Sequence, residues 1–226
     1  MLLEELWDLY ARDVFPLSST DRLFNQYQDA DLRAERPDGP AIRRANLRSC
    51  LASYRDLPIV LVVGEAAGPW GMRWSGVPFT SERQLVKQIV PFQGEVTSRE
   101  DPIVRIGRRS PHTSGSATIF WRVMRQWFPA FLAVDVVPFF PHAKGDLLKK
   151  ASPSDLEMRR FLPVLEQTSV LLRPAKTVAV GKTASKALDS LGMDHQAVHH
   201  TAHDAKKEFP AGMQAIFEDL RRQGLV

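Results

Sequence analysis

Short apolar runs alternate along this sequence with longer segments whose apolar residues recur at helical spacing. The run at 58–63, Pro-Ile-Val-Leu-Val-Val, is wholly apolar and ends at Gly64, a pattern typical of a strand buried on both faces of a parallel sheet. Similar runs occupy residues 131–137, 177–180 and 196–199. Helices are predicted over 81–89, 116–127, 154–172, 183–191 and 211–222. This alternation predicts a three-layer α/β/α sandwich around a central, mainly parallel four-stranded sheet.

The first 55 residues carry a helical pattern of their own. Apolar residues recur at helical spacing from Leu2 to Tyr10 and again from Ile42 to Tyr54. We therefore expect a helical N-terminal extension, about 1–55, that lies beside the sheet. The sequence holds no internal repeat, low-complexity run or long linker, which favours a single domain over 1–226.

Composition excludes several classes of protein. Of the 226 residues, 44% are hydrophobic and 25% are charged, and no apolar run reaches the about 18 residues that a membrane span needs. Acidic residues stand near the N-terminus where a signal peptide carries basic ones, so we expect a cytoplasmic protein with no membrane partner. The single cysteine, Cys50, excludes an internal disulfide, an iron–sulfur cluster and a cysteine-based zinc site. The net charge of +4 allows a polyanionic partner without requiring one.

Ligands of an open parallel sheet bind beyond the carboxyl ends of its strands, so the segments that follow the strands are candidate sites. Gly181-Lys182-Thr183 is similar to the end of a phosphate-binding loop. That loop needs a glycine five positions earlier, where this chain has Lys176, so we reject a nucleoside triphosphate site and expect a strand-to-helix turn at Gly181.

The segment 64–85 places four glycines, two tryptophans and Glu65 directly after a buried strand. Glycine lets backbone approach a ligand closely, Glu65 has the position of a general base, and Phe79 offers a flat face for an aromatic ring. The alternatives are that Glu65 caps a turn and that Phe79 belongs to the core. The segment 199–212 follows the last strand and carries three histidines, which suit an acid, an anion binder or a metal ligand.

A basic, hydroxyl-rich segment at 105–116 precedes a predicted helix. Three arginines and four hydroxyls stand where the free N–H groups of a helix N-terminus favour a phosphate. A solvated loop is the alternative.

Three motifs in this order resemble the uracil-DNA glycosylase superfamily, in the branch whose first motif is Gly-Glu-Ala-Pro-Gly. They are Gly64-Glu-Ala-Ala-Gly68, Gly76-Val-Pro-Phe-Thr-Ser-Glu82 and His200-Thr-Ala202. The resemblance spans about 58–217 and includes the middle segments 138–142 and 178–182. It implies a monofunctional DNA glycosylase of base excision repair that flips a damaged or deaminated base out of DNA and hydrolyses its N-glycosidic bond.

The resemblance also assigns roles to single residues. It implies that Glu65 positions or deprotonates the attacking water, that His200 donates a hydrogen bond to the departing base, and that Phe79 stacks on that base. Backbone amides near Glu65 and Ala66 hold its carbonyl oxygen. No cofactor and no metal are implied, the partner is DNA, and we expect a monomer that associates with the nucleoid when it acts on DNA. The candidate DNA-binding residues are Arg105, Arg108, Arg109, Ser114, Ser116, His203, Lys206 and Lys207.

Three positions depart from the family pattern. Asp135 stands where an asparagine usually binds the edge of uracil, and Ala67 and Thr201 stand where proline is usual. An ionised aspartate only accepts hydrogen bonds, whereas a protonated one also donates, so Asp135 puts the identity of the excised base in question. Two other functions stay open: a damaged-DNA-binding protein with little turnover, and a metal-dependent hydrolase built on His199, His200, His203 and Asp204.

Overall fold

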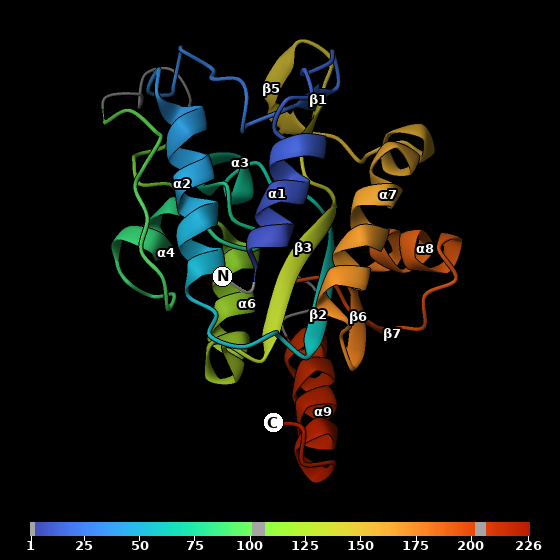
Figure 1. The fold of residues 1–226 in the computed structure, drawn as a ribbon. Helices are drawn as coiled ribbons and strands as arrows, with labels where there is room; N and C mark the ends of the chain where they lie inside the picture. The colour runs from blue at the N-terminus through green and yellow to red at the C-terminus, as the bar shows by residue number, and fades with distance from the viewer. Residues whose placement is uncertain (1–2, 101–106, 202–206) are drawn as a thin grey trace.

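The computed structural model describes residues 3–100, 107–201 and 207–226 (Figure 1). Its helices are α1 (Glu4–Asp13), α2 (Gly39–Ala52), α3 (Met72–Ser75), α4 (Glu82–Val86), α6 (Gly115–Met124), α7 (Asp155–Leu172), α8 (Lys182–Ser190) and α9 (Glu208–Arg222), with a 3-10 turn, η1 (Arg125–Trp127). Its strands are β1 (Leu23–Phe24), β2 (Val60–Ala66), β3 (Phe131–Val137), β4 (Phe140–Ala143), β5 (Asp146–Lys150), β6 (Lys176–Val180) and β7 (Gln196–Val198). No helix in these ranges is long and apolar enough to cross a membrane.

The central sheet has the strand order β3-β2-β6-β7, and all three pairings are parallel. These are the four strands that the sequence predicts. Along the chain, the connection from β2 to β3 crosses the sheet in one direction. The connections from β3 to β6 and from β6 to β7 cross it in the opposite direction. Because β–α–β crossovers are right-handed, α6 lies on one face of the sheet, and α7 and α8 lie on the other. The predicted three-layer sandwich is confirmed.

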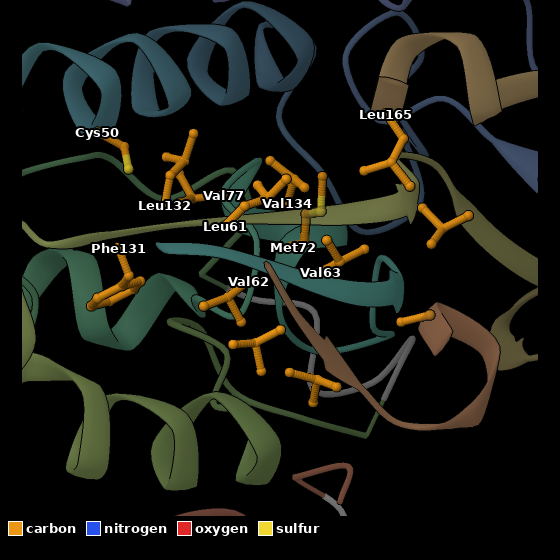
Figure 2. Packing of buried hydrophobic residues seen from close by; sticks show 14 of the residues in the cluster. Cys50, Leu61, Val62, Val63, Met72, Val77, Phe131, Leu132, Val134 and Leu165 are labelled. Carbon is orange, nitrogen blue, oxygen red and sulfur yellow. The ribbon is translucent and has the colours of Figure 1, made fainter. Parts of the chain in front are cut away.

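Helices cover both faces of the sheet with apolar side chains (Figure 2). Phe131 and Leu132 are neighbours in β3 and point to opposite sides, and Leu132 points toward Cys50 of α2. In β2 the residues from Val60 to Val63 are fully buried, as the wholly apolar run predicts. The sheet is therefore packed between two layers of helices, and its carboxyl edge is where side chains become partly exposed.

The N-terminal segment is only partly helical. It contains α1 and α2, as predicted, but between them β1 pairs antiparallel with β4, and β4 pairs with β5. This second sheet is not predicted by the sequence, because β1 has two residues and β5 lacks an alternating apolar pattern. Gly145, with φ of +78°, supplies the left-handed backbone that the tight turn between β4 and β5 uses.

Some boundaries differ from the predicted ones by a few residues. Helix α9 begins at Glu208 rather than at 211, because Pro210 falls in the first turn, where its missing N–H group is tolerated. Helix α7 begins where predicted, since the Ser154 hydroxyl accepts a hydrogen bond from Glu157 N and the Glu157 carboxylate accepts one from Ser154 N.

A buried ionic network joins the N-terminal segment to the rest of the chain. Glu35 accepts hydrogen bonds from Arg43 of α2 and from Arg73 of α3, and all three side chains are fully buried. Arg73 also donates to Leu147 O at 2.9 Å, which ties β5 to the same network. One carboxylate thus holds two helices and the β4–β5 hairpin together.

Replacing Glu35 with Ala is expected to lower the free energy of unfolding by about 3–5 kcal/mol, because it leaves two buried guanidinium groups without their shared anion. Chemical denaturation measures the change. The matched control is Asp38→Ala, which removes an exposed ion pair with Arg36 and is expected to cost less than about 1 kcal/mol. Equal losses in the two variants would contradict a structural role for the network.

Candidate active site

A cleft of about 450 Å³ opens at the carboxyl edge of the parallel sheet. Many of the predicted site residues line it together, although they come from segments far apart in the sequence. These predicted residues are Glu65, Ala66, Phe79, Arg108, Ser114, Ser116, Asp135 and His200. The β2–β3 register places Gly64 beside Asp135, which explains how two strands contribute to one site.

The cleft depends on the absence of a side chain at Gly64. A Cβ atom there would lie 2.2 Å from Asp135 Oδ1 and 2.6 Å from Phe79 Cζ. Both side chains therefore occupy space above the Gly64 backbone. The Phe79 ring also stacks on the buried Phe120 ring at a centroid distance of 4.4 Å. Phe79 is thus both a part of the core packing and a wall of the cleft.

Glu65 is held by two groups from different elements. Thr183 Oγ1 of α8 donates to Glu65 Oε2 at 2.8 Å, and Lys150 Nζ of β5 lies 3.1 Å from Glu65 Oε1 as an ion pair. Burial acts to raise the pKa of Glu65. Lys150, the Thr183 hydroxyl and His200 act to lower it, and their combined effect is larger, so the pKa lies below its usual range. Glu65 is therefore an oriented, ionised carboxylate, and it does not cap the following turn in this structure.

Asp135 has the opposite character. Burial raises its pKa to about 7, with Lys150 acting against this shift and Glu65 adding to it. No hydrogen bond reaches its carboxyl group from residues 3–100, 107–201 or 207–226. Near neutral pH the carboxyl group is divided between its acid and ionised forms, and it is available to a ligand in the cleft.

His200 lies against the turn between β6 and α8. Gly181, with φ of +89°, forms that turn as predicted, and a Cβ atom there would lie 3.3 Å from the His200 Cβ atom. Burial lowers the pKa of His200, Lys150 lowers it further, and Glu65 opposes them. The imidazole is therefore neutral near neutral pH, and a neutral imidazole still carries one N–H donor.

The predicted DNA-binding residues fall into three groups. Arg108, Ser114 and Ser116 line the cleft, and the Arg108 guanidinium lies 4.2 Å from the centroid of the Trp70 ring. Arg109 and Lys207 are exposed and are not among the residues that line it. Arg105, His203 and Lys206 lie outside the described residues.

Of the cluster considered for a metal, His203 and Asp204 also lie outside the described residues. In the described ranges, no group of three or more His, Cys, Asp and Glu side chains is arranged to hold a metal ion.

Sequence reasoning missed Lys150, Thr183 and Trp70 as residues of this site. Lys150 lies on a strand that the sequence does not predict, so no pattern marked it. The sequence predicts Thr183 only as the first residue of a helix, yet its hydroxyl orients Glu65. Trp70 belongs to the tryptophan-rich segment that was noted, but nothing in the sequence shows that Arg108 packs on its ring.

The comparisons with known proteins identify the family. A family model of the Uracil DNA glycosylase superfamily matches residues 53–221. The chain belongs to this superfamily. The crystal structure of wild-type Pedobacter heparinus SMUG2 shares the fold, with a TM-score of 0.62, 13% sequence identity, and coverage of 96% of this chain and 98% of that chain. No curated protein matches this member of the superfamily.

Replacing Lys150 with Met is expected to raise the pKa values of Glu65 and Asp135, because the cation that lowers both is removed. Carboxyl carbon NMR titration measures each value directly and does not depend on catalysis. Lys150→Arg should keep both values near those of the wild type. Lys149→Met, an exposed neighbour on the same strand, is the control. A Glu65 titration that stays in place in Lys150→Met would exclude Lys150 as the group that holds it ionised.

Proposed function

We propose that this member of the uracil DNA glycosylase superfamily excises a deaminated or damaged base from DNA by hydrolysing the N-glycosidic bond. The observation that supports this most is the joint placement of Glu65, Phe79, Asp135 and His200 around one cleft. This reaction needs four groups, which these residues supply in the same order: a carboxylate, an aromatic face, a hydrogen-bonding group for the edge of the base, and a neutral hydrogen-bond donor. A base within a duplex stack cannot enter such a cleft, so the nucleotide flips out first.

Glu65 suits the water-activating role because it is already ionised and oriented. Its carboxylate is fixed by Thr183 and Lys150. In the proposed step it orients a water whose oxygen bonds to C1′ of the sugar, while the bond from C1′ to the base nitrogen breaks and the water proton passes to Glu65.

His200 suits the stabilisation of the departing base. The base leaves with the bonding electron pair, and negative charge collects on its carbonyl oxygen. A neutral His200 donates a hydrogen bond to that oxygen, together with the backbone near Ala66. Donors fixed before the reaction stabilise developing charge more than the mobile dipoles of water do.

Asp135 faces the edge of the bound base, and its protonation state determines which hydrogen bonds it can form with that edge. The acid form accepts a hydrogen bond through its carbonyl oxygen and donates one through its hydroxyl, as the asparagine amide does toward N3–H and O4 of uracil. The ionised form accepts only and repels O4. We therefore propose that uracil is bound by the acid form of Asp135.

A panel of single- and double-stranded oligonucleotides tests the proposed function. The strands carry uracil, hypoxanthine, xanthine, mismatched thymine or damaged cytosine, and abasic sites are scored after incubation. We expect excision of at least one deaminated base. Tight binding to a damaged strand with no abasic product would instead support the damaged-DNA-binding alternative.

Glu65→Gln is expected to reduce excision by about 100-fold or more while DNA affinity stays close to that of the wild type, since the carboxamide keeps the shape and cannot accept the proton of water. Single-turnover rates and gel shifts measure the two quantities separately. Glu95→Gln, which changes an exposed carboxylate that does not line the cleft, is the control. Wild-type rates in Glu65→Gln would exclude the proposed role.

Asp135→Asn is expected to raise uracil excision, and to raise it more at pH 8 than at pH 6. With a pKa of about 7 the acid form of Asp135 dominates at pH 6 and is the minor form at pH 8, so the ratio of variant to wild-type rates should grow by about tenfold across this range. Taking the ratio removes the pH dependence that the two proteins have in common. A ratio that is constant with pH, or a variant that loses uracil excision while folded, would show that Asp135 does not bind uracil in this way.

A further inference from the structure

A second cleft, of about 440 Å³, lies beside the base-binding cleft and plays no part in the mechanism above. The two clefts share Thr113. Helix α6 supplies residues to both: Ser116 and Ala117 line the first cleft, whereas Thr118, Trp121 and Arg122 line the second. Arg125, the first residue of η1, continues the same side of the helix into the second cleft. The spacing of 118, 121, 122 and 125 is that of one helical face. The second cleft, here called the arginine groove, thus follows one side of α6.

The floor of the arginine groove is fixed by hydrogen bonds. Gln84 Nε2 of α4 donates to Ala117 O of α6 at 2.9 Å, which joins the two helices. Trp121 Nε1 donates to Thr80 Oγ1 at 3.0 Å. Thr80 directly follows Phe79, which lines the base-binding cleft, so this hydrogen bond links Trp121 of the groove to the segment that carries Phe79.

The rim of the arginine groove is strongly basic. Arg83, Arg122 and Arg125 line it, all three are exposed, and no acidic residue is among the lining residues. Within the described part of the chain none of the three forms an ion pair with a carboxylate, in contrast to Arg12, Arg22 and Arg36. Three like charges around one groove repel one another, and an anion relieves that repulsion.

We infer that the arginine groove binds the phosphate backbone of the DNA strand that flanks the flipped nucleotide. This rests on the proposed function, because it is the occupied base-binding cleft that brings a strand to Thr113. A planar guanidinium group can donate two parallel hydrogen bonds to the oxygens of one phosphate. A DNA strand carries phosphates at regular intervals, and the groove carries several arginines along its length. The hydroxyl of the exposed Thr113 adds an uncharged donor to the same lining, whereas the hydroxyls of Ser81 and Thr118 already donate to Gln84 Oε1 and Ser114 O.

The test is the salt dependence of binding to a uracil-containing duplex, measured in a Glu65→Gln background so that excision does not interfere. Arg122→Gln/Arg125→Gln should weaken binding and reduce the slope of log affinity against log salt by about two, since each lost phosphate contact reduces it by about one. Arg122→Lys/Arg125→Lys keeps both charges and should keep most of the slope. The matched control is Arg159→Gln/Arg160→Gln on α7, on the opposite face of the sheet. The unfolding midpoint of each variant shows that it is folded.

Several outcomes would overturn the inference. One is an unchanged slope in Arg122→Gln/Arg125→Gln, and another is an equal decrease in the α7 control. Inorganic phosphate, titrated by NMR, separates the two sources of phosphate: loss of its binding with an unchanged DNA slope would make the groove a site for small anions. If the oligonucleotide panel yields no excision but the slope decreases as expected, the proposed function fails and the groove stands.

Discussion

The missing side chain at Gly64 is the constraint on which the site depends. Parallel pairing of β2 with β3 places Gly64 beside Asp135, and the Phe79 ring closes over the same backbone. Any Cβ atom would occupy the space that these two side chains fill. The sheet therefore does more than hold elements in order, because its register brings a carboxyl group and an aromatic ring to one point at the carboxyl edge.

One lysine sets the electrostatics of two carboxyl groups with opposite behaviour. Lys150 pairs with Glu65 and helps to lower its pKa, whereas at Asp135 it is outweighed by burial, and the pKa rises to about 7. Two neighbouring carboxyl groups driven apart in this way can serve as an ionised base and as a proton-bearing partner for a ligand at one pH. In the proposed function the first activates water and the second binds the base.

The buried ionic network connects this chemistry to the N-terminal segment. Arg73 binds Glu35 and also the backbone of Leu147 in β5, the strand that ends at Lys150. The N-terminal segment, expected to lie beside the sheet, thus helps to position a residue of the site. The arginine groove beside the cleft differs from this network, because its three arginines form no ion pairs in the described residues and repel one another. In the inference above, the phosphates of the flanking DNA strand supply the missing negative charge.

The sequence by itself determined the four strands of the central sheet, the helices between them and eight of the residues that line the cleft. It could do so because apolar periodicity and strand-end positions are local properties, as in the run before Gly64, and because the motifs around Glu65, Phe79 and His200 are contiguous. Only the tertiary structure decided the partner of Glu65, the protonation of Asp135 and the existence of the β4–β5 hairpin. Each of these depends on contacts between residues far apart in the chain: Lys150 with Glu65, burial around Asp135, and β1 with β4. A sequence pattern carries no record of such contacts, since they arise only when packing brings the segments together and excludes water.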